Sequence, residues 1–173
     1  MLPSPLHPAV VHFPIVLMFL LPLAGLAALW WIGRGSRPVR AWMLPVLTAA
    51  ALAGSSWLAV ESGESQEDRA ETVVGEAAVS RHEHAAERFM LFSVTVLGLT
   101  ALGLIRGRVG AAARWFAPVA AAALIVAGYQ VGHSGGQLVY GDGNRPGLVS
   151  AASEADRERD VHDDDRESEA REE

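Results

Sequence analysis

Four apolar blocks alternate with charged segments along the chain. Apart from His12, the blocks contain no Asp, Glu, Lys, Arg or His, and they cover residues 10–32, 41–60, 89–105 and 115–132. A helix rises about 1.5 Å per residue, so about 20 apolar residues cross the roughly 30 Å of hydrocarbon in a bilayer. We therefore predict an all-α protein, a four-helix transmembrane bundle that lies in the lipid bilayer.

The ends of these blocks favour a membrane over the alternative, a buried helical hairpin in a soluble protein. Tryptophans stand at the block ends, as they do where membrane helices cross the headgroup region; they are Trp30, Trp31, Trp42 and Trp115. The first block is longer than the apolar core of a cleavable signal peptide, and no basic residue precedes it. We expect it to remain in the mature protein.

The distribution of arginine predicts which side of the membrane each connection faces. The connections 33–40 and 106–114 carry arginine and no acidic residue. Positively charged loops stay in the cytoplasm. We therefore expect both connections inside, and both termini and the loop 61–88 outside.

The C-terminal segment has a different composition from the apolar blocks. Residues 148–173 are rich in Asp, Glu and Arg, and such a segment buries too little apolar surface to offset its ordering entropy. We predict a transmembrane domain over residues 1–147 and a disordered acidic tail over residues 148–173. His162 is then an ordinary solvated histidine.

Several kinds of chemistry are excluded by what the sequence lacks. It has no cysteine, which excludes disulfides, thiolate metal sites and covalent attachment of haem through cysteine. It also lacks the phosphate-binding, dinucleotide-binding and serine-nucleophile motifs of soluble enzymes, and a basic surface for nucleic acid. Histidine or carboxylate must hold any metal or redox centre.

Five histidines fall on the predicted outer side: His7, His12, His82, His84 and His133. Ser80 followed by Glu83 fits a capping box, which would begin the third helix at about Ser80. Residues two apart lie about 200° around a helix axis, so only one of His82 and His84 can face the interior. We prefer His84, because it is nearer the membrane.

The first helix offers a second candidate, His12. It lies about 140° around the helix from His7 and about one turn inside the span, where ionisable residues are usually functional. Pro8 suits the first turn of a helix. Pro14 cannot donate to the carbonyl of Val10, so we expect a bend beside a polar site.

Glycines surround His133. Gly128 and Gly132 have the small-xxx-small spacing that allows close helix contact. Gly135 and Gly136 fit two alternatives. One is a sharp turn just after His133 that ends the fourth helix, and the other is the close approach of a flat cofactor or a neighbouring backbone.

Two motifs resemble a known family. "HPAVVHFPI" near the N-terminus and "GHSGGQLVYGDG" after the last apolar block resemble the bacterial four-helix predicted membrane proteins of domain of unknown function 2231, over residues 6–143. Relatives of this kind are found attached to Rieske or c-type cytochrome domains. The resemblance therefore implies a bacterial inner-membrane protein in electron transfer, with a redox partner at the outer membrane face.

The first functional hypothesis is a b-type haem protein. Haem iron accepts two neutral imidazoles, and four-helix bundles build such sites between facing helices. His12, His84 and His133 are the candidate axial ligands. Arg88, one turn below His84, would pair with a haem propionate.

Two other hypotheses use the same histidines differently. In the second, they hold a divalent metal together with Glu61, Glu83 or Glu87, because imidazole and carboxylate suit zinc, copper, iron or nickel. In the third, the protein is a non-catalytic membrane scaffold or accessory subunit, and the histidines are only interfacial.

Overall fold

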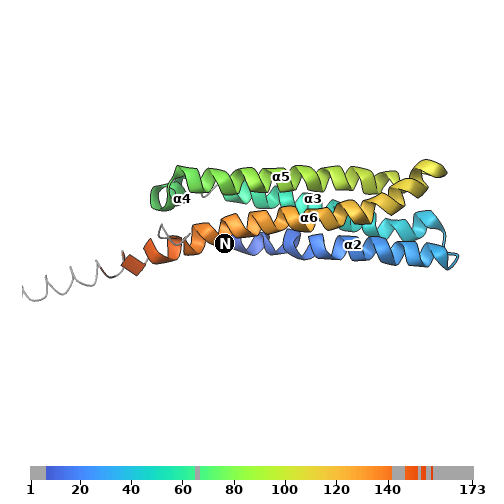
Figure 1. The fold of residues 1–173 in the computed structure, drawn as a ribbon, viewed down its shortest axis with the longest axis horizontal. Coiled ribbons are helices and arrows are strands. Elements are labelled where there is room, and N and C mark those ends of the chain that lie inside the picture. Colours follow the sequence, from blue (N-terminus) through green and yellow to red (C-terminus); the bar gives the residue numbers. More distant parts are fainter. Residues whose placement is uncertain (1–6, 65–66, 142–146, 152, 155–156, 158–173) are drawn as a thin grey trace, which may run out of the picture.

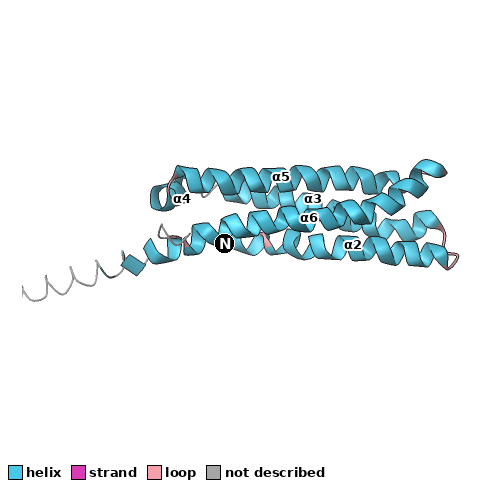
Figure 2. Cartoon of the chain, viewed as in Figure 1, coloured by secondary structure: helices cyan, strands magenta, loops and turns pink. Residues whose placement is uncertain are grey.

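Four long helices form a bundle (Figure 1). The structure, a computed structural model, describes residues 7–64, 67–141, 147–151, 153–154 and 157. Its helices are α1 (His7–Val10), α2 (His12–Gly33), α3 (Pro38–Glu64), α4 (Glu67–Val74), α5 (Glu76–Leu102) and α6 (Arg108–Tyr140). Helices α2, α3, α5 and α6 are each long and apolar enough to cross a membrane, and no strand occurs in the described residues (Figure 2). The predicted all-α bundle of four transmembrane helices is confirmed.

The four helices run alternately in opposite directions, and each packs against two neighbours. Helices α2 and α5 lie at opposite corners of the bundle, and each packs against α3 and α6. The α2–α3 and α5–α6 connections lie together at one end (Figure 1). We call it the arginine end, because it carries Arg34, Arg37, Arg40, Arg106, Arg108 and Arg114. We call the opposite end, with α1, α4, the start of α5 and the end of α6, the histidine end.

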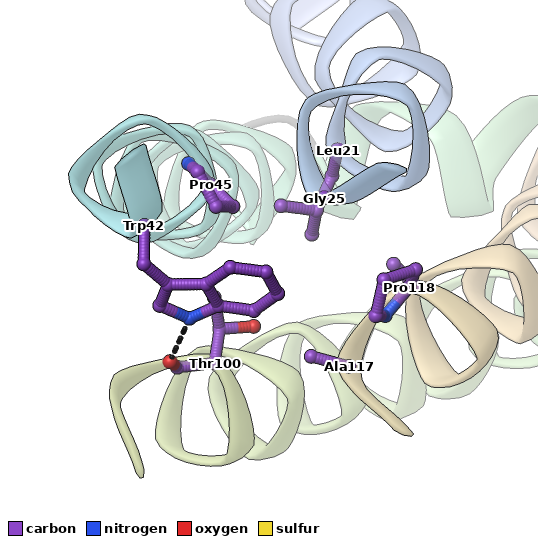
Figure 3. Close-up of a pocket in the computed structure, with 8 residues that line it drawn as sticks. Leu21, Gly25, Trp42, Pro45, Thr100, Ala117 and Pro118 are labelled. Carbon is purple, nitrogen blue, oxygen red and sulfur yellow. Dashed lines mark hydrogen bonds between the residues drawn. The ribbon is translucent and has the colours of Figure 1, made fainter. Parts of the chain in front are cut away.

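Trp42 organises the core at the arginine end. This α3 side chain is fully buried, and its indole Nε1–H donates to the carbonyl of Thr100 on α5 over 2.8 Å (Figure 3). Gly103 lies against the indole ring, which a Cβ would overlap, and a Cβ on Gly25 of α2 would lie 2.8 Å from Cγ of Pro118 on α6. The hollow between these side chains has no room for a water molecule. Small residues thus allow the helices to pack without gaps here.

The middle of the bundle is an apolar core with a few buried hydroxyl groups. Ser56, Ser93 and Thr100 are buried, and each donates to the carbonyl four residues earlier on its own helix. No buried side-chain nitrogen or oxygen of the described residues lacks a hydrogen-bond partner. Large apolar side chains such as Leu91 and Phe116 are exposed on the outside, as expected for surfaces that face lipid.

The first helix is interrupted before Pro14. Helix α1 ends at Val10 and α2 begins at His12. Proline has no N–H for the Val10 carbonyl, and the next backbone contact, from Ile15 to the carbonyl of Val11, is long at 3.4 Å. Pro14 itself is buried.

Two predicted helix limits are wrong. Helix α5 begins at Glu76, after the N-cap Gly75 with φ +87°, and not at Ser80, because residues 76–79 also favour helix. Helix α6 continues through Gly135 and Gly136 to Tyr140 and ends at Gly141, where φ is +85°. Packing against α5 overrides the low helix propensity of the two glycines.

The start of the predicted acidic tail is ordered. A Cβ on Gly147 would overlap backbone atoms of Val139 to Gly141, so the chain returns onto the end of α6 there. Residues 148–151 are helical, since they are small or apolar and lack the charge of the later tail. The predicted tail therefore begins with a helical turn, and residues 158–173, including His162, lie outside the described residues.

Candidate functional site

Close contacts show how the helices are aligned at the histidine end. A Cβ added to Gly128 of α6 would overlap the sulfur of Met18 on α2 and lie 3.3 Å from the ring of Phe89 on α5. A Cβ added to Gly135 would lie 3.0 Å from Cε1 of His82. The two contacts are seven residues apart on both α5 and α6, in opposite directions. The helices are therefore antiparallel and stay packed for two further turns.

This alignment gives the heights of the predicted ligands. His133 and His84 each lie five residues beyond the level of Gly128, which corresponds to about 7.5 Å along the bundle. His12 lies six residues beyond the same level, or about 9 Å. Three histidines from three helices therefore share one layer, as the sequence predicts. Whether they share a ligand depends on where their side chains point.

Arg88 begins the charged part of α5. It is exposed, directly before the buried Phe89, at the level of the contact between Phe89 and Gly128. Beyond this level α5 continues over residues 76–88 and α6 over residues 129–140, about 18–20 Å each. Together with α4, which packs against α5, these segments form a projection that we call the polar head.

His82 connects the two long helices of the polar head. Its ring is half-buried, and its Nδ1 lies 3.0 Å from Ser134 Oγ. The Ser134 hydroxyl donates to the carbonyl of Val131 over 3.0 Å. Because a hydroxyl has one hydrogen, the His82 Nδ1–H must be the donor to Ser134. Gly135 makes this possible, since it leaves space for the ring.

His84 points away from the bundle, so the preference for His84 over His82 is wrong. Its side chain is 62% exposed, and its Nδ1 contacts Glu87 Oε2 at 3.3 Å. A pair of this length on the surface adds little stability. Only one of the two histidines lies inside, as their separation of about 200° around the helix requires, and the space over Gly135 selects His82.

A stripe of polar and aromatic side chains follows the outward face of α6. We call it the α6 ladder; its members, at spacings of three and four residues, are Tyr129, His133, Gln137 and Tyr140. The rings of Tyr129 and His133 are stacked, with centroids 6.0 Å apart and planes 12° apart. The Gln137 amide donates to His133 Nε2 over 3.3 Å. Tyr129 is 70% exposed and Tyr140 is 78% exposed.

The predicted haem and metal ligands do not form an interior site. His12, His84, His133 and Arg88 are all exposed. In the part of the chain that the structure describes, no three His, Cys, Asp or Glu side chains form a group that could hold a metal ion. Two axial imidazoles must point at one iron, so these side chains do not fit a haem inside a single chain. The side chain of His7 lies outside those described.

Sequence reasoning missed the partner of His82. Ser134 carried no separate signal, although the run His-Ser-Gly-Gly did indicate a close approach to α6. A close approach occurs at Gly135, but the approaching group is the side-chain ring of His82, and not the cofactor or backbone that the sequence predicts at His133. The other alternative, a turn just after His133, is wrong.

A model of a family of predicted membrane proteins, DUF2231, matches residues 3–145. The chain belongs to this family. The match to DUF2231 covers the four membrane helices and the polar head, and confirms the family predicted from the sequence. No curated protein and no solved structure matches the chain.

Proposed function

We propose that this protein is a non-catalytic accessory subunit of the membrane, whose polar head binds a partner protein through the α6 ladder. The exposed side chains of the ladder carry this proposal. Tyr140 lies about 18 Å beyond the level of Gly128, at the end of the polar head, where its side chain is 78% exposed. A tyrosine in this position can be covered by a partner protein.

The chemistry of the ladder suits a protein interface. Tyrosine is enriched in interfaces, because it buries a large area with few rotatable bonds. His133 is held between the Tyr129 ring and the Gln137 amide, so less side-chain freedom is lost when a partner covers it. On the opposite side of α6, Ser134 connects to α5 through His82. The ladder thus lies on a pair of packed helices rather than on a loop.

The same proposal includes an orientation in a bacterial inner membrane. The arginine end carries all the basic residues of the two short connections, and loops of this kind are retained in the cytoplasm. We place the polar head on the outer side, together with both termini. The partner protein is then met outside the cytoplasm.

Electron transfer through haem b stays a prediction. It rests on the shared height of His12, His84 and His133, and their exposure leaves it without an interior site in one chain. Absorption spectra of the oxidised and reduced protein in detergent test it directly. A sharp reduced α-band that disappears in His84→Ala would replace the accessory function with a redox one.

Photo-crosslinking in native membranes tests the accessory function. Benzoylphenylalanine replaces Tyr140 in one variant and Trp115 in another. Trp115 is 69% exposed, and it is aligned with the ladder, because it lies 18 residues, or five turns, before His133. We expect a discrete protein adduct at Tyr140 and only lipid adducts at Trp115. Equal adducts at both positions, or none at Tyr140, would contradict the proposal.

A further inference from the structure

We propose that the arginine end binds anionic phospholipids through their phosphate groups. The described stretches 7–60 and 88–141 contain no Asp or Glu, and the nearest acidic residues in sequence, Glu61 and Glu87, belong to the histidine end. Among the described residues, the six arginines therefore have no carboxylate partner at their end of the bundle. Clustered like charges repel one another, so this surface favours an external anion.

Most of these arginines are accessible. The exposed residues are Arg34, Arg37, Arg40, Arg106 and Arg108. Arg114 is half-buried and donates to the carbonyl of Gly103, so it holds the α5–α6 connection in place. The exposed guanidiniums come from two connections that the bundle brings to one end (Figure 1). Both connections therefore present cationic side chains at the same end of the bundle.

Tryptophan places this region at the height of lipid headgroups. Trp30, Trp31 and Trp115 are exposed at the arginine end, and exposed tryptophan on membrane helices marks the headgroup level. The Arg34 guanidinium lies 4.0 Å from the centre of the Trp30 ring. This cation–π contact keeps the charge at the ring, at the height of lipid phosphates.

Backbone groups add to the positive potential. Helices α3 and α6 both begin at the arginine end, and neither has an acidic residue in its first turn. The N-cap of α6 is Gly107, with φ +91° and no side-chain cap. The first N–H groups of a helix attract anions through their dipole and unsatisfied donors. Arg106 and Arg108 flank this uncapped start.

The height of the region favours lipid over a soluble anion. A phosphate at the Trp level belongs to the surrounding leaflet, and an anionic lipid can bury its chains against exposed apolar side chains such as Phe116 and Val119. Inorganic phosphate makes only the ionic part of this contact. The lipid should therefore bind where inorganic phosphate at the same concentration does not.

Thermal unfolding of the full chain in detergent tests this inference. Dioleoylphosphatidylglycerol is titrated into micelles against dioleoylphosphatidylcholine, at low and high salt, and inorganic phosphate is added alone in a separate arm. We expect phosphatidylglycerol to raise Tm, because a ligand of the folded state stabilises it. High salt should reduce this shift. Phosphatidylcholine and inorganic phosphate should give no comparable shift.

Matched variants locate the site. Arg106→Gln with Arg108→Gln should weaken the apparent affinity for phosphatidylglycerol about 30-fold, at roughly a factor of five per lost charge. Arg81→Gln with Arg88→Gln removes two arginines from the histidine end and should leave the affinity unchanged. Arg106→Lys with Arg108→Lys keeps the charge and should retain most of the shift, whether or not the glutamine variant folds.

Several results would overturn the inference. They are the absence of a phosphatidylglycerol shift, an equal shift with inorganic phosphate, and an equal loss of affinity in the two glutamine variants. The crosslinking result at the α6 ladder does not bear on this test, because the two surfaces lie at opposite ends of the bundle.

Discussion

The adjacent glycines Gly135 and Gly136 should respond in opposite ways to alanine. Alanine favours a helix interior over glycine by about 1 kcal/mol, and nothing lies within 4 Å of a Cβ built on Gly136. Gly136→Ala should therefore stabilise the protein by about that amount. The Cβ of Gly135→Ala would lie 3.0 Å from the His82 ring. The ring must move, and its hydrogen bond to Ser134 is strained or lost.

The size of the difference follows from the contacts. A typical hydrogen bond contributes about 0.5–1.5 kcal/mol, so its loss cancels the helix-propensity gain at Gly135. We expect Gly135→Ala to be near neutral or destabilising, about 1 kcal/mol less stable than Gly136→Ala. For a chain of this size, about 1 kcal/mol corresponds to roughly 2–4 °C in Tm. Thermal unfolding of both variants in the same detergent resolves this difference.

A double-mutant cycle with His82→Ala identifies the cause. Without the imidazole ring, Gly135→Ala should become as favourable as Gly136→Ala, because the added methyl group meets nothing. Gly132→Ala serves as a second control, since a Cβ there is also free of contacts. The reasoning is refuted if Gly135→Ala stabilises wild type as much as Gly136→Ala does, or if its effect is unchanged in His82→Ala.

Three other perturbations have definite expected results. Trp42→Phe should destabilise the protein by about 0.5–1.5 kcal/mol, the contribution of a typical hydrogen bond, since it removes the indole donor from the carbonyl of Thr100, which still accepts from the N–H of Gly103. A lower Tm in detergent would show this. Removal of residues 158–173 should change Tm by less than about 1 °C, because their sequence has almost no apolar side chain to bury. A larger drop would show that this segment packs against the bundle. Reporter fusions after Arg37 and after Arg108 should both behave as cytoplasmic, and a periplasmic signal from either would reverse the proposed orientation.

The membrane helices could be predicted from the sequence because the length of an uninterrupted apolar run is enough to identify each of them. Inside a bilayer, blocks such as 41–60 and 115–132 can satisfy their backbone hydrogen bonds only by forming helices. Between the two arginine-rich connections the chain crosses the membrane twice. The sequence therefore also predicts that both connections lie at the same end of the bundle. These features depend on the average composition of long stretches of the chain, which can be read directly from one sequence.

The polar head was predicted less well because it depends on contacts between helices. Ser80 resembles an N-cap, yet α5 begins earlier, at Glu76, and Gly135 resembles a helix end, yet α6 continues past it. Both errors arose because α5 and α6 support each other in the polar head. The choice between His82 and His84 likewise depends on the space over Gly135, which belongs to a different helix and is 53 residues away from His82.

The size of the complex extracted from native membranes tests the central claim most directly. The protein is extracted into polymer nanodiscs without detergent, and the mass of the complex is measured by native mass spectrometry. We predict that the 18.4 kDa chain is recovered in a stoichiometric complex with a second protein. We predict that Tyr129→Ala with Tyr140→Ala is recovered alone, at normal abundance and with unchanged Tm. Recovery of the wild type as a single chain, or a complex that survives both substitutions, would contradict the account.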